Sequence, residues 1–560
     1  MLDKNPVLES TYRAPFALRR SSKLLFALAL SIFVVTFITA VALTASVARG
    51  RLSIPPMYDD VVYLYWSQQI IHAPPHTSIF SALYQMLDQH SPLTTLFGIV
   101  GYTLFQSGDI GPYIVATTPL VPFVMVCVLL LDGLPILAII GIIGAVGSLP
   151  ILRNFVTEFR PEPAWGALTA ISAIAFFAID VFSCTRRKQI AIGLLAGLAV
   201  ISKPTTSPLT MAILAVAFLG ANVVSFIEQR RGGSPPRFQS IVAGTATVSI
   251  AALVVIIPVG AIIGPEIYGY ITWVMRDVST QVKYEGSFLD HVLFYSIRAS
   301  GLQMLGASFP IFLAIWIVGI SYAARRQPAV LPRILAVFLV VLISYAVPSV
   351  SVVKFVWFGA AFYSILIIAT LYLIGLLYRL PSDFRLPPSP KVWLLRSIFA
   401  IGIVLFFSSN LMDQPSRLFS MDAAARADLT DRSERTWSVL QAAKRARMVS
   451  EAPGHVSNVM TIASEPIMGA VISLYGMKEN LPIRALEFSY AQSVDELIER
   501  LPEMDYVVVA PSSKQALSGA MLGDGLLAVM KERPDFSRIA TLPLRSGVAA
   551  NIYERNLKGN

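Results

Sequence analysis

The stretch Met57-Tyr58-Asp59-Asp60-Val61-Val62-Tyr63 follows closely on an apolar run at 24–48 that is long enough to cross a membrane. The stretch therefore opens the first loop of a membrane protein and places two adjacent carboxylates beside the bilayer. Carboxylates in that position are costly unless they are solvated, paired or used. The pair alone could be two solvated loop acids, so its meaning depends on the rest of the chain.

Composition assigns the chain to the membrane proteins. Of 560 residues, 55% are hydrophobic and 14% are charged, and the mean hydropathy is +0.65. A soluble domain carries about a quarter charged residues. The net charge of +10 is attributed to cytoplasmic loops, so no nucleic acid is expected as a partner. The two cysteines, Cys127 and Cys184, lie in or beside apolar segments, which predicts neither a disulfide framework nor a cysteine zinc site.

Apolar stretches that could span a bilayer, each about 17 to 25 residues long, number about eleven. They lie near 24–48, 111–131, 134–150, 163–183, 190–205, 206–227, 241–263, 301–323, 331–348, 354–378 and 396–412. Along this alternating path the basic clusters fall on one side, which the positive-inside rule assigns to the cytoplasm. These clusters are Lys4–Lys23, Arg186–Lys188, Arg230–Arg237, Arg325–Arg333 and Arg379–Arg396.

The predicted protein is therefore a polytopic α-helical protein of the inner or plasma membrane. Its N-terminal tail, 1–23, is cytoplasmic, its transmembrane domain covers 24–412, and residues 413–560 lie outside. The apolar core of the first span, Leu24–Leu43, is longer than that of a cleaved signal peptide. We therefore expect it to remain as a signal-anchor helix.

The outer C-terminal region, 413–560, predicts a small α/β domain because strands alternate with a helix. Ser493–Leu501 has the capping box of a helix start. The strands are expected at Val456–Ala463 and Tyr506–Ala510 and in a closing hairpin, Ala540–Leu544 with Val548–Tyr553, where Pro543 suits only an edge strand. No glycine-rich phosphate loop follows these strands, so no nucleotide cofactor is expected.

Charged residues gather on the outer side of the predicted path. The first outer loop, 49–110, carries the acidic pair and His90, and a second outer loop, 264–300, carries Arg276 and Lys283. A short outer turn holds Glu158, Arg160 and Glu162, and two lone cations, Lys203 and Lys354, stand at outer helix ends. Each residue taken singly could mark the edge of the bilayer or be a snorkelling anchor. Together, carboxylates and isolated cations suit an anionic, lipid-linked substrate.

These segments resemble, in order, the GT-C superfamily of membrane glycosyltransferases, particularly the branch of protein O-mannosyltransferases and aminoarabinose transferases. The resemblance covers most of residues 20–410. Asp59–Tyr63 is similar to the Asp-Glu-x-x-Tyr segment of that family, and His90-Ser91-Pro92-Leu93 to its His-Pro-Pro-Leu. The further similar segments are Phe105–Gly108 to a Phe-Gly, Phe159–Glu162 to an Arg-Pro turn, Gly193–Lys203 to Gly-Leu-Ala-x-Leu-Thr-Lys, and Lys354-Phe355 to Arg-Tyr. The chain departs from the pattern at Asp60, Ser91 and Lys354.

The resemblance implies an inverting glycosyltransferase that uses a polyprenyl-phosphate-linked sugar at the outer face, with a lipid, glycan or protein as acceptor. An acceptor hydroxyl needs a carboxylate base, and the leaving phosphate needs cations or a metal. Asp59 aligns with the first acid of the family's pair and is expected to be the base, with Asp60 in support. Lys203 and Lys354 are the expected phosphate ligands. His90, Arg160, Arg276 and Lys283 are further candidates for substrate binding, and Glu158, Glu162 and Asp60 are candidate ligands for Mg²⁺ or Mn²⁺.

Two other classes of function stay open. A polysaccharide polymerase or ligase would handle a similar substrate on a different fold. A transporter or flippase of lipid-linked sugar would favour polar groups near the bilayer midplane and two related halves. In this chain the charges gather at one face and no halves are visible, which favours the transferase.

Overall fold

The computed structural model describes most of the chain from Arg20 to Arg379 and from Val456 to Asn556. The gaps are 50–51, 53–55, 57–58, 74–77, 88–89, 106–107, 180, 182–183, 232–237, 275, 277–282, 463–468, 479, 489–490, 492, 513–520 and 544–548. The predicted last span, 396–412, and residues 413–455 lie outside the described residues. We call the first described part the helix bundle and the second the sheet domain.

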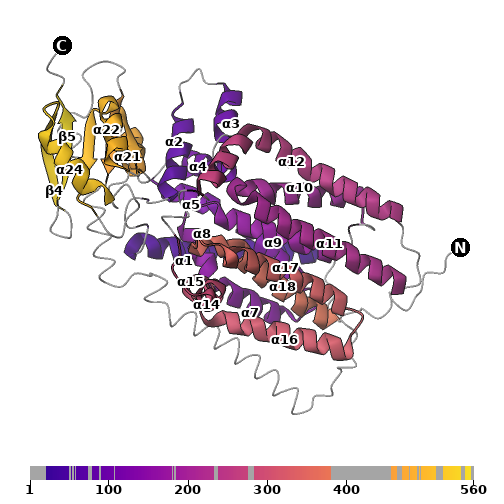
Figure 1. The fold of residues 1–560 in the computed structure, drawn as a ribbon. Coiled ribbons are helices and arrows are strands. Elements are labelled where there is room, and N and C mark those ends of the chain that lie inside the picture. The colour runs from indigo at the N-terminus through magenta and orange to yellow at the C-terminus, as the bar shows by residue number, and fades with distance from the viewer. Residues whose placement is uncertain are drawn as a thin grey trace.

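The helix bundle is formed by helices that run back and forth between two ends (Figure 1). The long passes are α1 (Arg20–Arg49), α5 (Ile110–Ala116) with α6 (Leu120–Leu130), α7 (Ile136–Gly147) with α8 (Pro150–Thr157), α9 (Glu162–Ala178), α10 (Arg186–Ser202), α11 (Ser207–Arg231), α12 (Phe238–Trp273), α16 (Phe309–Arg326), α17 (Leu331–Val350) and α18 (Ala360–Arg379). Short helices fill the connections at one end: α2 (Asp59–Ile71), α3 (Ile79–Leu87), α4 (Pro92–Phe105), α14 (Phe288–Leu293), α15 (Ala299–Leu305) and the 3₁₀ turn η5 (Val356–Gly359).

Fewer of these helices than predicted have the length of a full membrane span. Among the described residues seven are long and apolar enough to cross a membrane, or eight if α7 and α8, bent by 56°, form one broken span. The predicted spans at 163–183 and 190–205 correspond to α9 and α10, which have 17 residues each. At 1.5 Å per residue such a helix covers only about 26 Å of a hydrocarbon core about 30 Å thick.

Ion pairs and hydrogen bonds join the basic connections at one end of the bundle. Lys23 Nζ lies 2.9 Å from Asp132 Oδ2, and the Arg379 guanidinium donates to the Leu130 carbonyl at 2.7 Å. Arg333 pairs with Glu228 at 2.5 Å, so the ends of α11 and α17 also meet there. The sheet domain lies beside α2 (Figure 1). Basic connections that were predicted for one side of the membrane therefore lie at one end of the bundle.

The centre of the bundle is α18. In its span, 83% of the most apolar window is buried, compared with 22% for α12, which is peripheral. Trp165 of α9 and Trp316 of α16 are among the largest fully buried side chains. Because α9 packs along α18, the turn before α9 and the turn before α18 are brought together at the same end of the bundle.

The sheet domain is the predicted α/β unit. Its five strands have the order β2-β1-β3-β5-β4, with β1 parallel to β2 and β3, and β5 antiparallel to β3 and β4. The elements are β1 (Ser457–Ile462), α21 (Gly469–Lys478), β2 (Ile483–Glu487), α22 (Val494–Arg500), β3 (Tyr506–Val509), α24 (Gly523–Glu532), β4 (Phe536–Pro543) and β5 (Ala549–Arg555). The predicted strands and hairpin are confirmed, Pro543 lies on an edge strand, and Ser493 caps α22 by accepting from the Glu496 amide.

Candidate active site at one end of the helix bundle

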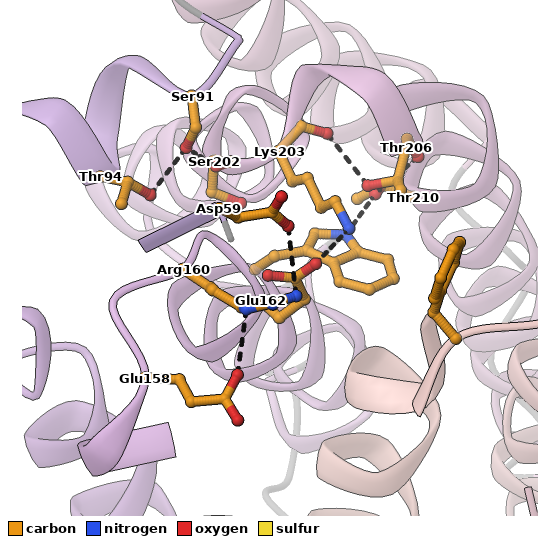
Figure 2. Close-up of polar contacts among 12 residues, drawn as sticks. Asp59, Ser91, Thr94, Glu158, Arg160, Glu162, Ser202, Lys203, Thr206 and Thr210 are labelled. Atoms are coloured by element: carbon orange, nitrogen blue, oxygen red, sulfur yellow. Dashed lines mark hydrogen bonds and ion pairs between the residues drawn. The ribbon is translucent and has the colours of Figure 1, made fainter. Parts of the chain in front are cut away.

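Four charged side chains converge at the end of the bundle that carries the sheet domain. Each comes from a helix terminus or a connection rather than from a helix centre. These are Asp59 at the start of α2, Arg160 in the turn between α8 and α9, Glu162 at the start of α9, and Lys203 directly after α10. The sequence-predicted residues are therefore brought together because their helices all begin or end here (Figure 2).

Arg160 is the hub of this cluster. Its guanidinium lies 3.1 Å from Asp59, 3.5 Å from Asp60 and 3.0 Å from Glu158, and only 13% of its side chain is exposed. Figure 2 shows the ion pairs that Arg160 makes with Glu158 on one side and Asp59 on the other. Burial disfavours the charged guanidinium, but the surrounding carboxylates outweigh this and raise the pKa of Arg160 above its usual range. The cation is therefore permanently charged.

The two adjacent aspartates have different surroundings. Asp60 is fully buried, and its Oδ2 accepts hydrogen bonds from the Tyr113 hydroxyl at 2.8 Å and from the Phe159 amide at 3.0 Å. The Asp59 side chain is 59% exposed and has Arg160 on one side. Successive helical residues point about 100° apart, which is why one carboxylate faces the core while the other stays accessible. Asp60 holds the turn before α9, and Asp59 is free to meet a substrate.

The pKa of Asp59 is raised, although more than half of its side chain is exposed. Desolvation by the surrounding protein is the main cause, and the neighbouring carboxylates of Glu162 and Asp60 act in the same direction. Arg160 opposes the shift by favouring the charged form. A carboxylate with a raised pKa is a stronger proton acceptor than an ordinary surface aspartate.

Lys203 forms a buried ion pair with Glu162. The distance between Nζ and Oε1 is 2.6 Å, and both side chains are less than 9% exposed. The ammonium also lies 5.3 Å from the Trp165 ring and 5.1 Å from the Phe358 ring. Trp165 is fixed in turn, because its Nε1 donates to Thr210 at 2.7 Å. Glu162 Oε2 is buried and has no hydrogen-bond partner among the described residues. This oxygen of the carboxylate is therefore left to accept a hydrogen bond.

Lys354 lies in the connection between α17 and α18 and is buried. Its Nζ donates to the carbonyl oxygens of Pro348 at 2.9 Å and Ser349 at 2.7 Å. Burial lowers the pKa of Lys354 to about 8. The next residues reach the other two cations, because Trp357 lies 5.6 Å from the Arg160 guanidinium and Phe358 lies beside Lys203. This segment is therefore one wall of the site.

The other predicted substrate-binding residues lie in less central positions. The His90 ring is stacked on Trp66 with a centroid distance of 5.7 Å and lies 5.1 Å from the Tyr270 ring. The side chains of Arg276 and Lys283 are exposed. The backbone of Lys283 forms an antiparallel bridge with Val353, which places it next to the Lys354 segment.

Ser91 stands where the segment that it resembles has a proline, and it makes contacts that a proline could not. Its hydroxyl pairs with Thr94 Oγ1 at 2.7 Å and donates to the Ser202 carbonyl at 3.1 Å. Ser202 is the last residue of α10 and precedes Lys203. The start of α4 is thus bonded to the segment that presents the lysine (Figure 2).

The carboxylates proposed as metal ligands do not form a metal site. Glu158 is paired with Arg160, Glu162 with Lys203, and Asp60 with Arg160 and two hydrogen-bond donors. In the part of the chain that the structure describes, no three His, Cys, Asp or Glu side chains are grouped so as to hold a metal ion. Because cations of the protein already neutralise these groups, the donor set does not fit Mg²⁺ or Mn²⁺.

Several residues of the site could not be identified as such from sequence. Tyr113 and the Phe159 amide hold Asp60, while Trp165, Trp357 and Phe358 line the two buried cations. Trp357 and Phe358 follow Lys354 so closely that an aromatic search around each lone cation could have found them. Tyr113 carries no such signal, because it is more than fifty residues from its partner in the chain.

Comparison with known proteins identifies the fold. No protein-family model matches the sequence, and no curated protein matches it either. Solved structures nevertheless share its fold over most of the chain.

Two of these structures are of one protein, ArnT from Cupriavidus metallidurans. Its complex with undecaprenyl phosphate aligns with a TM-score of 0.54 and 13% identity, covering 93% of this chain and 98% of that chain. Its apo form aligns with a TM-score of 0.51 and 13% identity, covering 92% and 97%. At this identity the likeness establishes a shared fold over nearly the whole of both chains.

Proposed function

We propose that this protein is an integral-membrane glycosyltransferase that moves a sugar from a polyprenyl phosphate to a lipid, glycan or protein acceptor. One observation carries the proposal: a single accessible carboxylate, Asp59, stands against Arg160 in an otherwise buried cluster of charges. The fold supports the proposed class of donor, because the ArnT structure with the same fold was solved with undecaprenyl phosphate bound.

In the proposed reaction an acceptor hydroxyl attacks the anomeric carbon of the donor sugar. Asp59 accepts the hydroxyl proton as the new carbon–oxygen bond forms. The bond between the anomeric carbon and the phosphate oxygen breaks, and the polyprenyl phosphate leaves with the electron pair. Attack opposite the leaving group inverts the anomeric configuration. No general acid is needed, because the phosphate is already a good leaving group.

Cations of the site would stabilise the charge that develops on the departing phosphate. Lys354 is the cation whose positive charge is most available to the phosphate. No carboxylate of the described residues lies within ion-pair distance of its ammonium, and two carbonyl oxygens hold the ammonium in place. Lys203 is already paired with Glu162, and Arg160 with Asp59. A phosphate would therefore have to share these cations with the carboxylates or displace the carboxylates from them. We infer that Lys354 makes the primary phosphate contact and that Lys203 assists.

The proposed site lies on the outer side of the membrane. The basic connections gather at the opposite end of the bundle, joined by pairs such as Lys23 with Asp132 and Arg333 with Glu228. Under the positive-inside rule that end faces the cytoplasm. The sheet domain, which lies beside the site, would then be extracytoplasmic.

The proposal is tested with purified protein and a panel of polyprenyl phosphates that carry different radiolabelled sugars. We expect one donor to lose its sugar to a membrane-extract acceptor, or slowly to water, with release of polyprenyl phosphate. In sealed vesicles, a donor that crosses the bilayer with its sugar still attached would identify a flippase instead. Donors that stay intact and on their original side with the whole panel and a total membrane extract would contradict both activities.

A further inference from the structure

Helix α21 of the sheet domain is shared between two hydrophobic cores. Ile472 is buried in the core of the sheet domain together with Val459 and Val508. Val471 and Leu474, both fully buried, belong instead to the core of the helix bundle. One helix of ten residues therefore packs the two parts of the protein against each other.

The part of the bundle that α21 contacts is α2, whose first residue is Asp59. Figure 1 shows α21 alongside α2, at the edge of the sheet domain nearest the bundle. Another neighbour of α2 is α4, because Ser67 of α2 donates to the Thr95 carbonyl of α4 at 3.1 Å. The short helix that presents Asp59 is thus held between the sheet domain and α4.

A polar cluster at the end of α21 strengthens this junction; we call Tyr102, Asp109, Tyr475 and Lys478 the Asp109 cluster. The Asp109 carboxylate is bonded to the Lys478 ammonium and accepts from the Tyr475 hydroxyl at 3.0 Å and the Tyr102 hydroxyl at 2.7 Å. The Lys478 ammonium also lies 5.2 Å from the Tyr102 ring. The Asp109–Lys478 pair is about 80% buried, so it is more than a solvated surface pair.

The Asp109 cluster is connected to the candidate base by a second route. Asp109 directly precedes α5 but makes no side-chain capping bond to that helix, because its carboxylate is turned to the sheet domain. Tyr113, one turn further along α5, donates to Asp60, and Asp60 is paired with Arg160. Arg160 in turn holds Asp59. Sheet domain, α5, Arg160 and Asp59 are therefore connected by direct contacts.

We propose that the sheet domain positions Asp59 for the reaction, by packing α21 against α2 and by anchoring α5 through Asp109 and Lys478. The inference rests on the proposed function and deepens it, since it gives the outer domain a part in the chemistry. Asp109 and Lys478 are positioning residues, because neither touches the candidate base. A displacement of about 1 Å at a reacting group is enough to lower turnover about 100-fold.

Two substitutions test the proposal in the full-length protein: Asp109→Asn and Lys478→Met. We expect each to lower kcat about 10- to 100-fold while the KM for the donor stays nearly constant. Hydrogen exchange of the α2 segment, Asp59–Ile71, should become faster in both. Lys478→Arg keeps the charge and should restore most of the activity. Arg500→Met is the matched control, because Arg500 pairs with Glu503 on the exposed surface of the same domain.

Unchanged kcat together with unchanged exchange of α2 in both variants would overturn the proposal, even if the wild-type enzyme transfers sugar. A loss of activity that Lys478→Arg fails to restore, without faster exchange in α2, would overturn it as well. Hydrogen exchange needs no substrate. Faster exchange in α2 with no transfer by the wild type would support the mechanical coupling while contradicting the proposed function. If Asp109→Asn does not fold, Lys478→Met at the end of α21 gives the same readouts.

Discussion

At the scale of single residues, the acidic pair divides two tasks between neighbouring positions. Asp60 is buried and accepts from Tyr113 and from the Phe159 amide, so it fixes the turn that carries Arg160. The Asp59 carboxylate is accessible and forms an ion pair with Arg160. The same change of Asp to Asn should therefore have different consequences at the two positions.

Asp60→Asn should destabilise the protein more than Asp59→Asn does. Removing a buried charge that is hydrogen-bonded and paired costs about 1.5–3 kcal/mol, whereas Asp59 is 59% exposed and its loss should cost little stability. Thermal unfolding in detergent measures the difference. Equal melting temperatures for the two variants would contradict the structural role of Asp60.

If Lys354 binds the donor phosphate as proposed, donor binding should depend on pH. Its pKa is lowered to about 8, so the ammonium is charged below that pH and neutral above it. Donor affinity should therefore fall as the pH rises through about 8. At lower pH, Lys354→Met should weaken donor binding about 10- to 150-fold, which is the effect of losing one charge-assisted hydrogen bond. Binding of a labelled donor on either side of this pH tests both statements.

The control for Lys354 is Lys188→Met. The Lys188 side chain is exposed in the first turn of α10, at the opposite end of that helix from Lys203. We expect this variant to bind donor with the pH dependence of the wild type. If Lys354→Met binds as tightly as the wild type and keeps the pH dependence, Lys354 is not a phosphate ligand and another cation must be sought.

At the scale of secondary structure, two glycines set the distance between α10 and α12. A Cβ added at Gly193 would lie 2.4 Å from the Val248 carbonyl oxygen, and one added at Gly197 would lie 2.8 Å from that of Ala252. Small residues four apart let helices in membranes approach closely. Because α10 ends just before Lys203, this packing also fixes the position of the Lys203 backbone in the site.

Gly193→Ala should force α10 and α12 apart and destabilise the protein by about 1–3 kcal/mol, since the obstructing atoms belong to the backbone. The control is Gly260→Ala on α12, where nothing lies within 4 Å of the added Cβ. That variant should be neutral or slightly stabilising. Melting temperatures in detergent measure both. Equal loss of stability in the two variants would show that the close approach is unimportant.

Some elements could be predicted from the sequence and others could not. The strand Tyr506–Val509 is a continuous apolar run, which is typical of a buried strand, and half of Ser457–Ile462 consists of the β-branched residues Val459, Thr461 and Ile462. Strand β2 has charged residues at Arg484 and Glu487 and was missed, because its pattern does not distinguish it from a loop. Helix α12 was expected to end at 263 but continues to Trp273 past Pro265, since a membrane helix can re-satisfy the backbone groups that proline frees.

The same limit applies to the site. Asp59, Arg160, Glu162 and Lys203 could be placed at one end because each stands next to an apolar span, and the fold brings them within ion-pair distance. The pairing itself could not be predicted, because Lys203 and Glu162 are 41 positions apart and their contact depends on how α9 packs against α10. The expectation of a carboxylate metal site took no account of the ion pairs that Arg160 and Lys203 make with these acids, because those pairs depend on the packing of the helices.

At the scale of the whole molecule, orientation is tested by cysteine labelling of intact cells. Glu285→Cys, near the site, should react with an impermeant maleimide, whereas Ala329→Cys, between α16 and α17, should react only after permeabilisation. Both positions are exposed. The native Cys184, in the connection between α9 and α10, should be protected like Ala329→Cys. Labelling of position 329 in intact cells would contradict the inferred orientation and would mean that the site faces the cytoplasm.

The most direct test of the central claim compares the wild type with Asp59→Asn in the donor assay. The asparagine keeps the size and polarity of the side chain but cannot accept a proton. We therefore expect Asp59→Asn to fold and bind donor normally while polyprenyl phosphate is released about 10²- to 10⁴-fold more slowly. Release at the wild-type rate by well-folded Asp59→Asn would contradict the account, because the accessible carboxylate would then have no part in the reaction.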